Sequence, residues 1–216
     1  MDYVLELLKP STFQLLWNGL KLTLYISSIS VVLSVLFGMI LAIMRNGKNP
    51  LFKWIATIYI EFVRNVPNLL WIFTVFLVFQ MKSTPAGITA FTTAAMAEII
   101  RGGLNAIGPG QTEAGLSQGF TPVQIMVYII MPQAIRKMLP AIISQIVTVI
   151  KDTSFLYSVI ALQELFGASQ ILMGRYFEAE QVFALYLMVA LIYFVINFAI
   201  SILSRYVAKS WASSIE

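Results

Sequence analysis

The chain contains neither cysteine nor histidine. Without cysteine it can form no disulfide framework and no thiolate metal site. The lack of histidine removes the commonest general base and metal ligand. Charged residues make up only 11% of the 216 residues, against about 25% in an ordinary soluble domain. These absences together disfavour a metalloprotein, an enzyme and a soluble domain.

Apolar residues, by contrast, make up 59% of the chain. A soluble protein of this size needs more polar surface than such a composition supplies. We therefore predict an all-α, polytopic membrane protein that forms a single domain over residues 1–216. Asp2 and Glu6 stand where a secretory signal would be basic, so the first span is expected to remain in the mature protein.

Five stretches are candidates for membrane spans. Residues 22–44 are uncharged and would be about 34 Å long as a helix. The region 54–81 is interrupted by charges and by Pro67, and the centre of the second span is placed at 68–79. The other three expected spans are residues 86–107, 141–165 and 182–204.

Lysine and arginine indicate how the spans are oriented, because they are enriched in cytoplasmic loops. With the N-terminus outside, nine basic residues fall on the inner side and four on the outer side. The inner residues are Arg45, Lys48, Lys53, Arg64, Arg101, Arg136, Lys137, Arg205 and Lys209, and the outer ones are Lys9, Lys21, Lys82 and Arg175. We therefore expect the N-terminus outside and the C-terminus in the cytoplasm.

A long polar connection, residues 101–137, is then cytoplasmic. Loops of this length in compact domains are usually functional or disordered, and this one carries helix signals. Thr112 is an expected N-cap with Glu113 in the first turn, and Gly119 is an expected helix-ending glycine. Ala114 and Gly115 would give this short helix a face of small residues, which lets a partner approach closely.

A second short helix is expected directly after the first. Thr121 is its expected cap and Pro122 its first residue. Pro132 is expected to stop the segment, since proline inside a helix removes a backbone hydrogen bond.

The spacing in this connection resembles a known motif. Glu113-Ala114-Gly115, then Gly119, then IIMP at residues 129–132 is similar to the EAA loop of ATP-binding-cassette (ABC) importer permeases, which reads E-A-A, three residues, G, nine residues, I-x-L-P. Gly115 and Met131 replace an alanine and a leucine of the pattern. The resemblance implies that Glu113, Ala114, Gly115 and Gly119 dock onto an ATPase subunit.

Further segments resemble the polar amino-acid permeases, the histidine/glutamine/glutamate/arginine group. They are WNG at 17–19, EFVRNVP at 61–67, AEIIRGG at 97–103, GQTEA at 110–114, PQA at 132–134 and KDTS at 151–154. Ala95 departs from the pattern, which usually has an aromatic residue there. The resemblance implies five spans in a bacterial cytoplasmic membrane, an ATPase dimer, a second permease copy and an extracytoplasmic amino-acid-binding protein, without nucleic acid.

No phosphate-binding loop of the form G-x-x-x-x-G-K-[ST] occurs. Gly103 and Gly108 have the glycine spacing, but Pro109 and Gly110 follow. We therefore expect that this chain binds no cofactor and that ATP and Mg are bound by the partner ATPase.

Polar residues within the expected spans are candidates for the translocation path. Ser144, Thr148, Lys151 and Asp152 occur at helical spacing and share roughly one face. Lys151 could meet the carboxylate of an amino acid, and Asp152 or Glu98 its ammonium group. The alternative is that Lys151 and Asp152 only pair with other helices to hold the bundle.

Glu61 and Arg64 are expected to pair with each other, since they are three residues apart on one helix. Two other classes of protein stay open. An integral-membrane enzyme would need a nucleophile with a base or a buried acid pair, and a non-transporting assembly scaffold would not need the polar face.

Overall fold

The computed structural model describes residues 9–80 and 84–212, with side chains described as far as residue 207. Asp2, Glu6 and Lys82, used above, lie outside these ranges. Every element of the described residues is helical. In chain order they are α2 (Pro10–Asn46), α3 (Pro50–Arg64), α4 (Asn68–Phe73), the π-helix η2 (Thr74–Val78), α5 (Thr84–Asn105), α6 (Pro109–Ser117), α7 (Pro122–Gln124), the π-helix η3 (Ile125–Ile130), α8 (Met131–Asp152), α9 (Phe155–Ile160), α10 (Leu165–Met173) and α11 (Ala179–Ala212).

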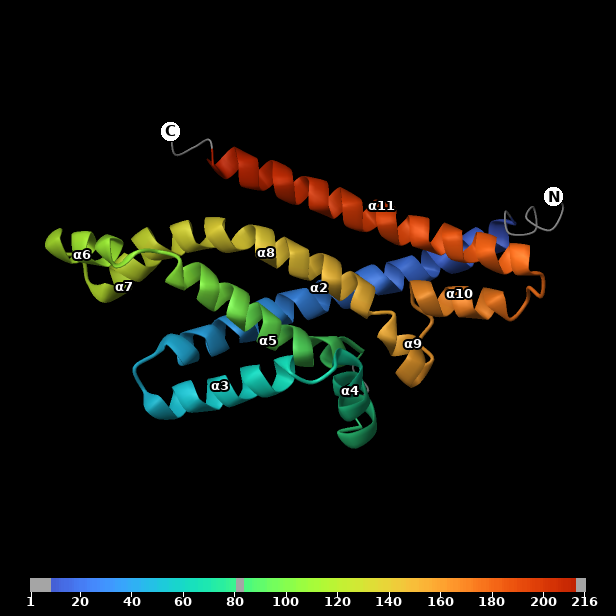
Figure 1. The fold of residues 1–216 in the computed structure, drawn as a ribbon, viewed down its shortest axis with the longest axis horizontal. Coiled ribbons are helices and arrows are strands. Elements are labelled where there is room, and N and C mark those ends of the chain that lie inside the picture. Colours follow the sequence, from blue (N-terminus) through green and yellow to red (C-terminus); the bar gives the residue numbers. More distant parts are fainter. Residues whose placement is uncertain (1–8, 81–83, 213–216) are drawn as a thin grey trace.

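The longest helices lie along one elongated body (Figure 1). α2 and α5 run side by side in the same direction, α8 packs on both, and α11 covers α8 and α10. α6 and α7 form one end of the body, whereas α9, α10 and the start of α11 lie toward the other. α2 and α11 begin at that second end and finish near the first, as expected for an odd number of passes.

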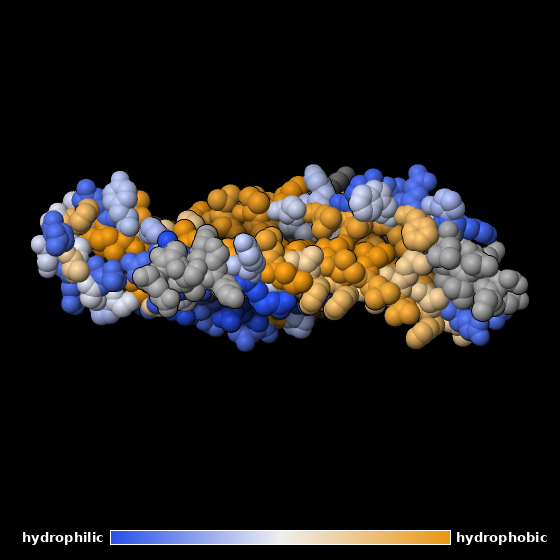
Figure 2. Space-filling view, turned by 90° about the horizontal axis from the view of Figure 1, so that it is seen from above, coloured by the Kyte–Doolittle hydropathy of each residue, from blue (hydrophilic) through white to orange (hydrophobic). Residues whose placement is uncertain are grey.

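The sides of this body are apolar. Large hydrophobic side chains such as Phe37 on α2 and Phe194 on α11 are exposed. Figure 2 shows mostly hydrophobic residues along the middle of one face and mostly hydrophilic residues at both ends. A contiguous apolar surface of this extent indicates contact with lipid.

Three helices of the described chain are long and apolar enough to cross a membrane: Pro10–Asn46, Pro122–Ile160 and Ala179–Val207. The pair Pro50–Arg64 and Asn68–Val78 is a fourth if the two helices, bent by 112°, form one span. α5 coincides with the expected third span, 86–107, but threonines and glycines reduce its apolarity. The expected number of five spans is therefore not confirmed.

One helix boundary differs from the prediction. Pro132 was expected to stop the second loop segment, but the chain stays helical from Pro122 to Ile160. The reason is local: η3 is a wider π-helical turn, and Pro132 falls in the first turn of α8 that follows it. A proline is tolerated where the hydrogen-bond register changes, because its missing N–H is not needed there.

α2 and α5 pack closely because both present small side chains. The buried face of α2 consists largely of Gly19, Thr23, Ser27, Ser30, Ser34, Gly38 and Ala42. A Cβ atom placed on Gly38 would lie 3.0 Å from both the backbone N of Ala97 and the Cβ of Met96. Contact between small residues allows the close approach of helices in membranes.

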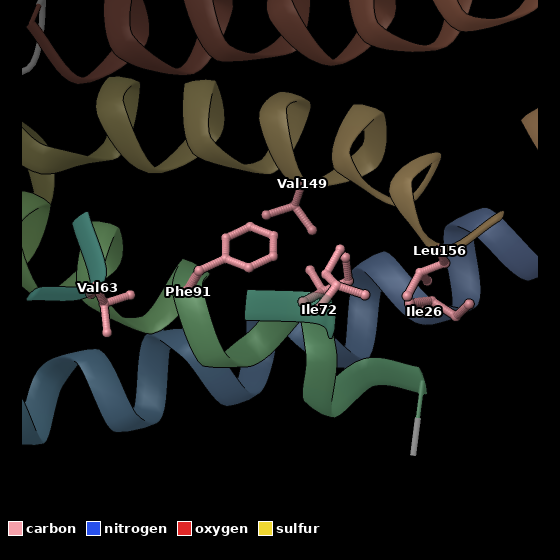
Figure 3. Packing of buried hydrophobic residues seen from close by; sticks show 8 residues of the cluster. Ile26, Val63, Ile72, Phe91, Val149 and Leu156 are labelled. Carbon is pink, nitrogen blue, oxygen red and sulfur yellow. The ribbon is translucent and has the colours of Figure 1, made fainter. Parts of the chain in front are cut away.

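Below α8, a hydrophobic cluster joins six helices. Its buried members include Ile26, Val63, Ile72, Phe91, Val149 and Leu156, which Figure 3 labels. They come from α2, α3, α4, α5, α8 and α9, so the cluster fixes the bent α3–α4 segment to the long helices.

The α2–α5 contact can be tested at its glycine. We expect Gly38→Leu to lower the free energy of unfolding by about 1–3 kcal/mol or more, because the leucine side chain would have to displace α5. Thermal unfolding of the purified protein in detergent measures this effect. The control is Gly102→Leu, since nothing lies within 4 Å of a Cβ there, and an unchanged Tm for Gly38→Leu would contradict the packing.

Candidate functional site

The first candidate site is the projection, defined as residues 109–130 of α6, α7 and η3. α6 begins at Pro109 with Gly108 as its N-cap. Thr112 was expected to be that cap, and this prediction is wrong, because proline in the first turn starts the helix four residues earlier. Gly119 does end the helix as expected: its φ of +81° is in the left-handed region that favours glycine.

The second helical segment begins as predicted. The Thr121 side chain accepts a hydrogen bond from the Gln124 N–H at 3.3 Å, and the Gln124 Oε1 accepts one from the Thr121 N–H at 2.8 Å. This capping box fixes the turn between α6 and α7.

Gly115 lies inside the projection. It is the buried residue of α6, and a Cβ there would lie 2.7 Å from Ile125 Cγ1 and 3.2 Å from Ile129 Cδ1. α6 thus rests directly on η3 through this glycine. In the isolated chain Gly115 therefore offers no surface to a partner, whereas Glu113 and Ala114 are exposed.

The base of the projection is tied to α8. The Lys137 ammonium donates to the Ala106 carbonyl at 2.6 Å, where α5 ends. The Gln133 side chain donates to Gln111 Oε1 at 3.1 Å. With the glycine contact above, these bonds make α6, η3 and the start of α8 one unit.

A second candidate site is an ionic cluster that joins α2, α3 and α5. Arg45 donates to Glu98 at 2.6 Å and to Glu61 at 2.5 Å. Arg101 binds both oxygens of Glu98 at 2.9 Å, and Arg64 lies 3.7 Å from it. The expected pairing of Glu61 with Arg64 is thus replaced by pairing with Arg45, which the end of α2 brings between the two glutamates.

Glu98 is the centre of this cluster. Its side chain is 15% exposed and faces three guanidinium groups. Charge-assisted and bidentate bonds of this kind are among the strongest in proteins. A substrate ammonium would have to compete with all three, so the role predicted for Glu98 in the substrate path stays a prediction without geometric support.

The polar residues of α8 that were predicted to share one face do not share one environment. Ser144 lies beside α11, whereas Asp152 lies beside α4. Ser144 lines a crevice of about 230 Å³ together with Ser201, Ser204 and Arg205 of α11. The Thr148 hydroxyl donates to the Ser144 carbonyl at 3.2 Å within its own helix. Ser144 therefore faces α11, whereas the Thr148 hydroxyl bonds within its own helix.

Lys151 and Asp152 lie at the opposite end of α8. Asp152 is partly buried and accepts a hydrogen bond from Asn68 Nδ2 of α4 at 3.2 Å. Lys151 is exposed, and no ion pair within the described chain includes it. The structure thus gives Asp152 a partner on another helix and leaves Lys151 on an uncovered face.

Sequence reasoning missed a buried carboxylate. Glu164 is fully buried and caps α10, accepting hydrogen bonds from the N–H groups of Phe166 and Gly167. The available signal was a polar residue directly before an apolar helical stretch. It was overlooked because residues 141–165 were assigned to one span, whereas Ala161 breaks the helix with a φ of +50°.

The fold and these sites define a class of protein. It is an all-helical, multi-pass membrane protein with a rigid helical projection at one end and ionisable side chains among its apolar helices.

The chain belongs to the family of binding-protein-dependent transport system inner membrane components, which it matches over residues 34–213. It is therefore a multi-pass protein of the cytoplasmic membrane and a transport component, not an enzyme. The family description itself names a binding protein as a partner of such systems.

Two relatives illustrate the similarity. The probable glutamine ABC transporter permease protein GlnP of Bacillus subtilis (strain 168) is 40% identical over 198 residues, covering 88% of this chain and 90% of the relative. The glutamate/aspartate import permease protein GltK of Escherichia coli O6:H1 is 32% identical over 213 residues, covering 91% of this chain and 93% of the relative.

Solved structures of ABC transporter chains have a similar fold. A chain from an amino acid ABC transporter crystallised with histidines superposes with a TM-score of 0.84 at 29% identity, covering 96% of this chain and 98% of that one. A chain of the inward-facing MetNI methionine ABC transporter has a TM-score of 0.72 at 20% identity, covering 92% of this chain and 99% of that one. The second likeness concerns the fold alone.

The ionic cluster predicts unequal effects of two glutamate substitutions. We expect Glu98→Gln to lower the free energy of unfolding by about 1–3 kcal/mol, because it leaves partly buried guanidinium groups without their shared carboxylate. Glu61→Gln is the control and should cost at most about 1 kcal/mol, since Glu61 is half exposed and meets one arginine. Equal shifts in Tm for the two variants would contradict a central role of Glu98.

Proposed function

We propose that this chain is the membrane-spanning permease subunit of an ABC importer for polar amino acids. The relatives named above are permeases for glutamine and for glutamate and aspartate. The observation that carries the proposal is the projection at the end of an apolar helical body, formed by the residues that resemble the EAA loop.

In this proposal the projection docks onto an ATPase subunit of an ATPase dimer, which binds ATP and Mg. Residues 101–137 form the coupling loop, with Glu113 and Ala114 on the exposed side of α6. Gly115 contributes by seating α6 on η3, and Gly119 by ending α6 without a side chain. Exposed apolar side chains beside them, Leu116 and Val123, would be covered by the ATPase.

Movement of the ATPase then reaches the membrane through α8. Gly115 seats α6 on η3, Gln133 joins α6 to α8, and Lys137 joins α8 to the end of α5. A displacement of α6 therefore moves the start of α8 with it. A flexible loop would absorb such a displacement. This physical coupling is what an importer needs between ATP hydrolysis and transport.

The same proposal sets the orientation. Arg136 and Lys137 lie near the start of α8, beside the projection, and Arg45 and Lys48 lie at and just after the end of α2, which finishes near the same end of the body. We infer from this excess of basic residues that this end is cytoplasmic. The N-terminus is then outside, the C-terminus inside, and the binding protein approaches the end formed by α10 and the start of α11.

Lys151 and Asp152 are proposed to line the translocation path, with Ser144, Thr148 and Glu98 as further candidates from the sequence. A charge facing lipid costs at least about 2.5–3.5 kcal/mol by insertion scales. The exposed Lys151 therefore requires water or another protein on its face of α8. A second permease copy across this face supplies both, since two copies would enclose an aqueous path between them.

Docking can be tested at Gly119. We expect Gly119→Asp to uncouple the complex: the permease inserts normally, but the ATPase no longer co-purifies or uptake is lost. An added carboxylate there lies at the C-terminal end of α6, where it opposes the helix dipole, and would be desolvated on docking. Gly119→Asn is the control, because asparagine tolerates the positive φ without the charge, and full uptake by Gly119→Asp would refute docking.

The path can be tested with charge removal on α8. We expect Lys151→Met and Asp152→Asn each to reduce uptake of radiolabelled glutamine, glutamate, histidine or arginine by about tenfold or more, since each removes a charge-assisted contact. Competition among these amino acids identifies the substrate. The control is Lys137→Met near the start of α8, far from Lys151 and Asp152 along the helix, which should leave the pattern of competition unchanged. Wild-type uptake by both Lys151→Met and Asp152→Asn would remove these two residues from the path.

A further inference from the structure

The α10–α11 turn, residues 174–178, presents a phenylalanine to its surroundings. Phe177 is 91% exposed, the highest value among the exposed large hydrophobic residues of the described chain. The turn lies at the end of the body opposite the projection (Figure 1). Most other exposed hydrophobic residues lie on the long helices that form the apolar sides, so Phe177 calls for a different explanation.

The neighbours of Phe177 exclude lipid tails as that explanation. Arg175, Glu178 and Glu180 are exposed on both sides of it, and no ion pair within the described chain includes them. Three unpaired ionisable side chains so close together would make burial of this turn in hydrocarbon costly. Phe177 therefore stands outside the apolar part of the membrane, within a rim of charged groups.

The backbone of the turn is held by hydrogen bonds. The Arg175 N–H donates to the Leu172 carbonyl at 2.9 Å, and the Tyr176 N–H donates to the Met173 carbonyl at 3.2 Å. The Tyr176 side chain packs against a buried hydrophobic cluster that α2, α10 and α11 share. One aromatic residue of the turn is thus held in the core while the next, Phe177, is left outside.

The helices on both sides of the turn are fixed as well. The Glu164 carboxylate, 0% exposed at the start of α10, accepts hydrogen bonds from the hydroxyls of Thr23 on α2 and Tyr193 on α11, both at 3.2 Å. A Cβ on Gly19 of α2 would lie 2.9 Å from the Glu164 carbonyl oxygen, so α10 has no room to slide along α2. A surface that is ordered before binding loses less conformational entropy when a partner docks.

We propose that Phe177 is the apolar anchor on which the extracytoplasmic binding protein docks, with Arg175, Glu178 and Glu180 as the charged rim of this contact. The inference rests on the proposed function, which puts this end of the chain outside the membrane. An aromatic residue at the centre of a polar rim is the usual arrangement of a binding hot spot. Because the rim has two acidic groups and one basic group, the matching surface of the binding protein is an apolar hollow flanked by an excess of basic side chains.

The anchor is tested with the complete permease–ATPase complex in proteoliposomes. Purified binding protein is added at increasing concentration, loaded with whichever of glutamine, glutamate, histidine and arginine the wild type accumulates. Uptake and ATP hydrolysis give the concentration of binding protein at which activity is half-maximal. The variant is Phe177→Ala, and the matched control is Phe183→Ala, the same change at a phenylalanine that is 71% exposed on the apolar side of α11.

We expect Phe177→Ala to raise the half-maximal concentration of binding protein by about tenfold or more, the size expected for truncation of a hot-spot residue. The rate at saturating binding protein and the amount of assembled complex stay at the wild-type level, because Phe177 has no part in the core. Phe183→Ala leaves the half-maximal concentration unchanged. Glu178→Lys combined with Glu180→Lys raises it and weakens its dependence on salt, because the charge attraction is lost.

A second measurement separates the binding protein from lipid. Phe177→p-benzoylphenylalanine is irradiated in the same proteoliposomes, and mass spectrometry identifies what it has joined. We expect a cross-link to the added binding protein. A cross-link to lipid alone, or a half-maximal concentration unchanged in Phe177→Ala or raised equally in Phe183→Ala, would overturn the inference. Failure of the proposed function is distinct, since the wild type would then accumulate no amino acid with any concentration of binding protein.

Discussion

The close contact between α2 and α5 is the constraint on which the rest of this structure depends. In a membrane, helices gain little from hiding apolar surface from one another, since lipid is equally apolar, and association relies on tight packing. Glycine and serine on α2 against alanine and methionine on α5 provide that packing. α8 then lies across both helices, and the bent α3–α4 segment is held beneath them by a shared apolar cluster. Every polar site described above is placed by this frame.

Charged residues occupy two zones of the frame in different ways. The ionic cluster around Glu98 neutralises its members within the protein and ties α2, α3 and α5 together near their ends. The pair at the far end of α8 is different, because Asp152 has only a neutral partner and Lys151 has an open face. Charges that are already paired suit a structural role, whereas incompletely paired charges inside a membrane protein suit contact with substrate or a second subunit.

α8 connects the two ends of the protein. At one end it continues through a π-helical turn into the projection, and at the other it carries Lys151 and Asp152 and is followed by α9. In the function proposed above, coupling would pass through this continuous helix and not through a mobile loop.

The sequence alone determined the membrane class, the helical content and the helical projection, because apolar composition, helix caps and motif spacing are local properties. Thr121 and Gly119 act as their neighbours along the chain predict. Only the tertiary structure decided that Gly115 faces η3 and that Glu61 pairs with Arg45 and not with Arg64. It also decided that the chain stays helical through Pro132. It alone revealed that Glu164 is buried and that, beside its local donors, it accepts hydrogen bonds from Thr23 on α2, 141 residues away, and from Tyr193 on α11. Such contacts depend on which helices become neighbours. Those neighbours are set by packing between small residues that are far apart in the sequence, and local spacing along the chain does not reveal them.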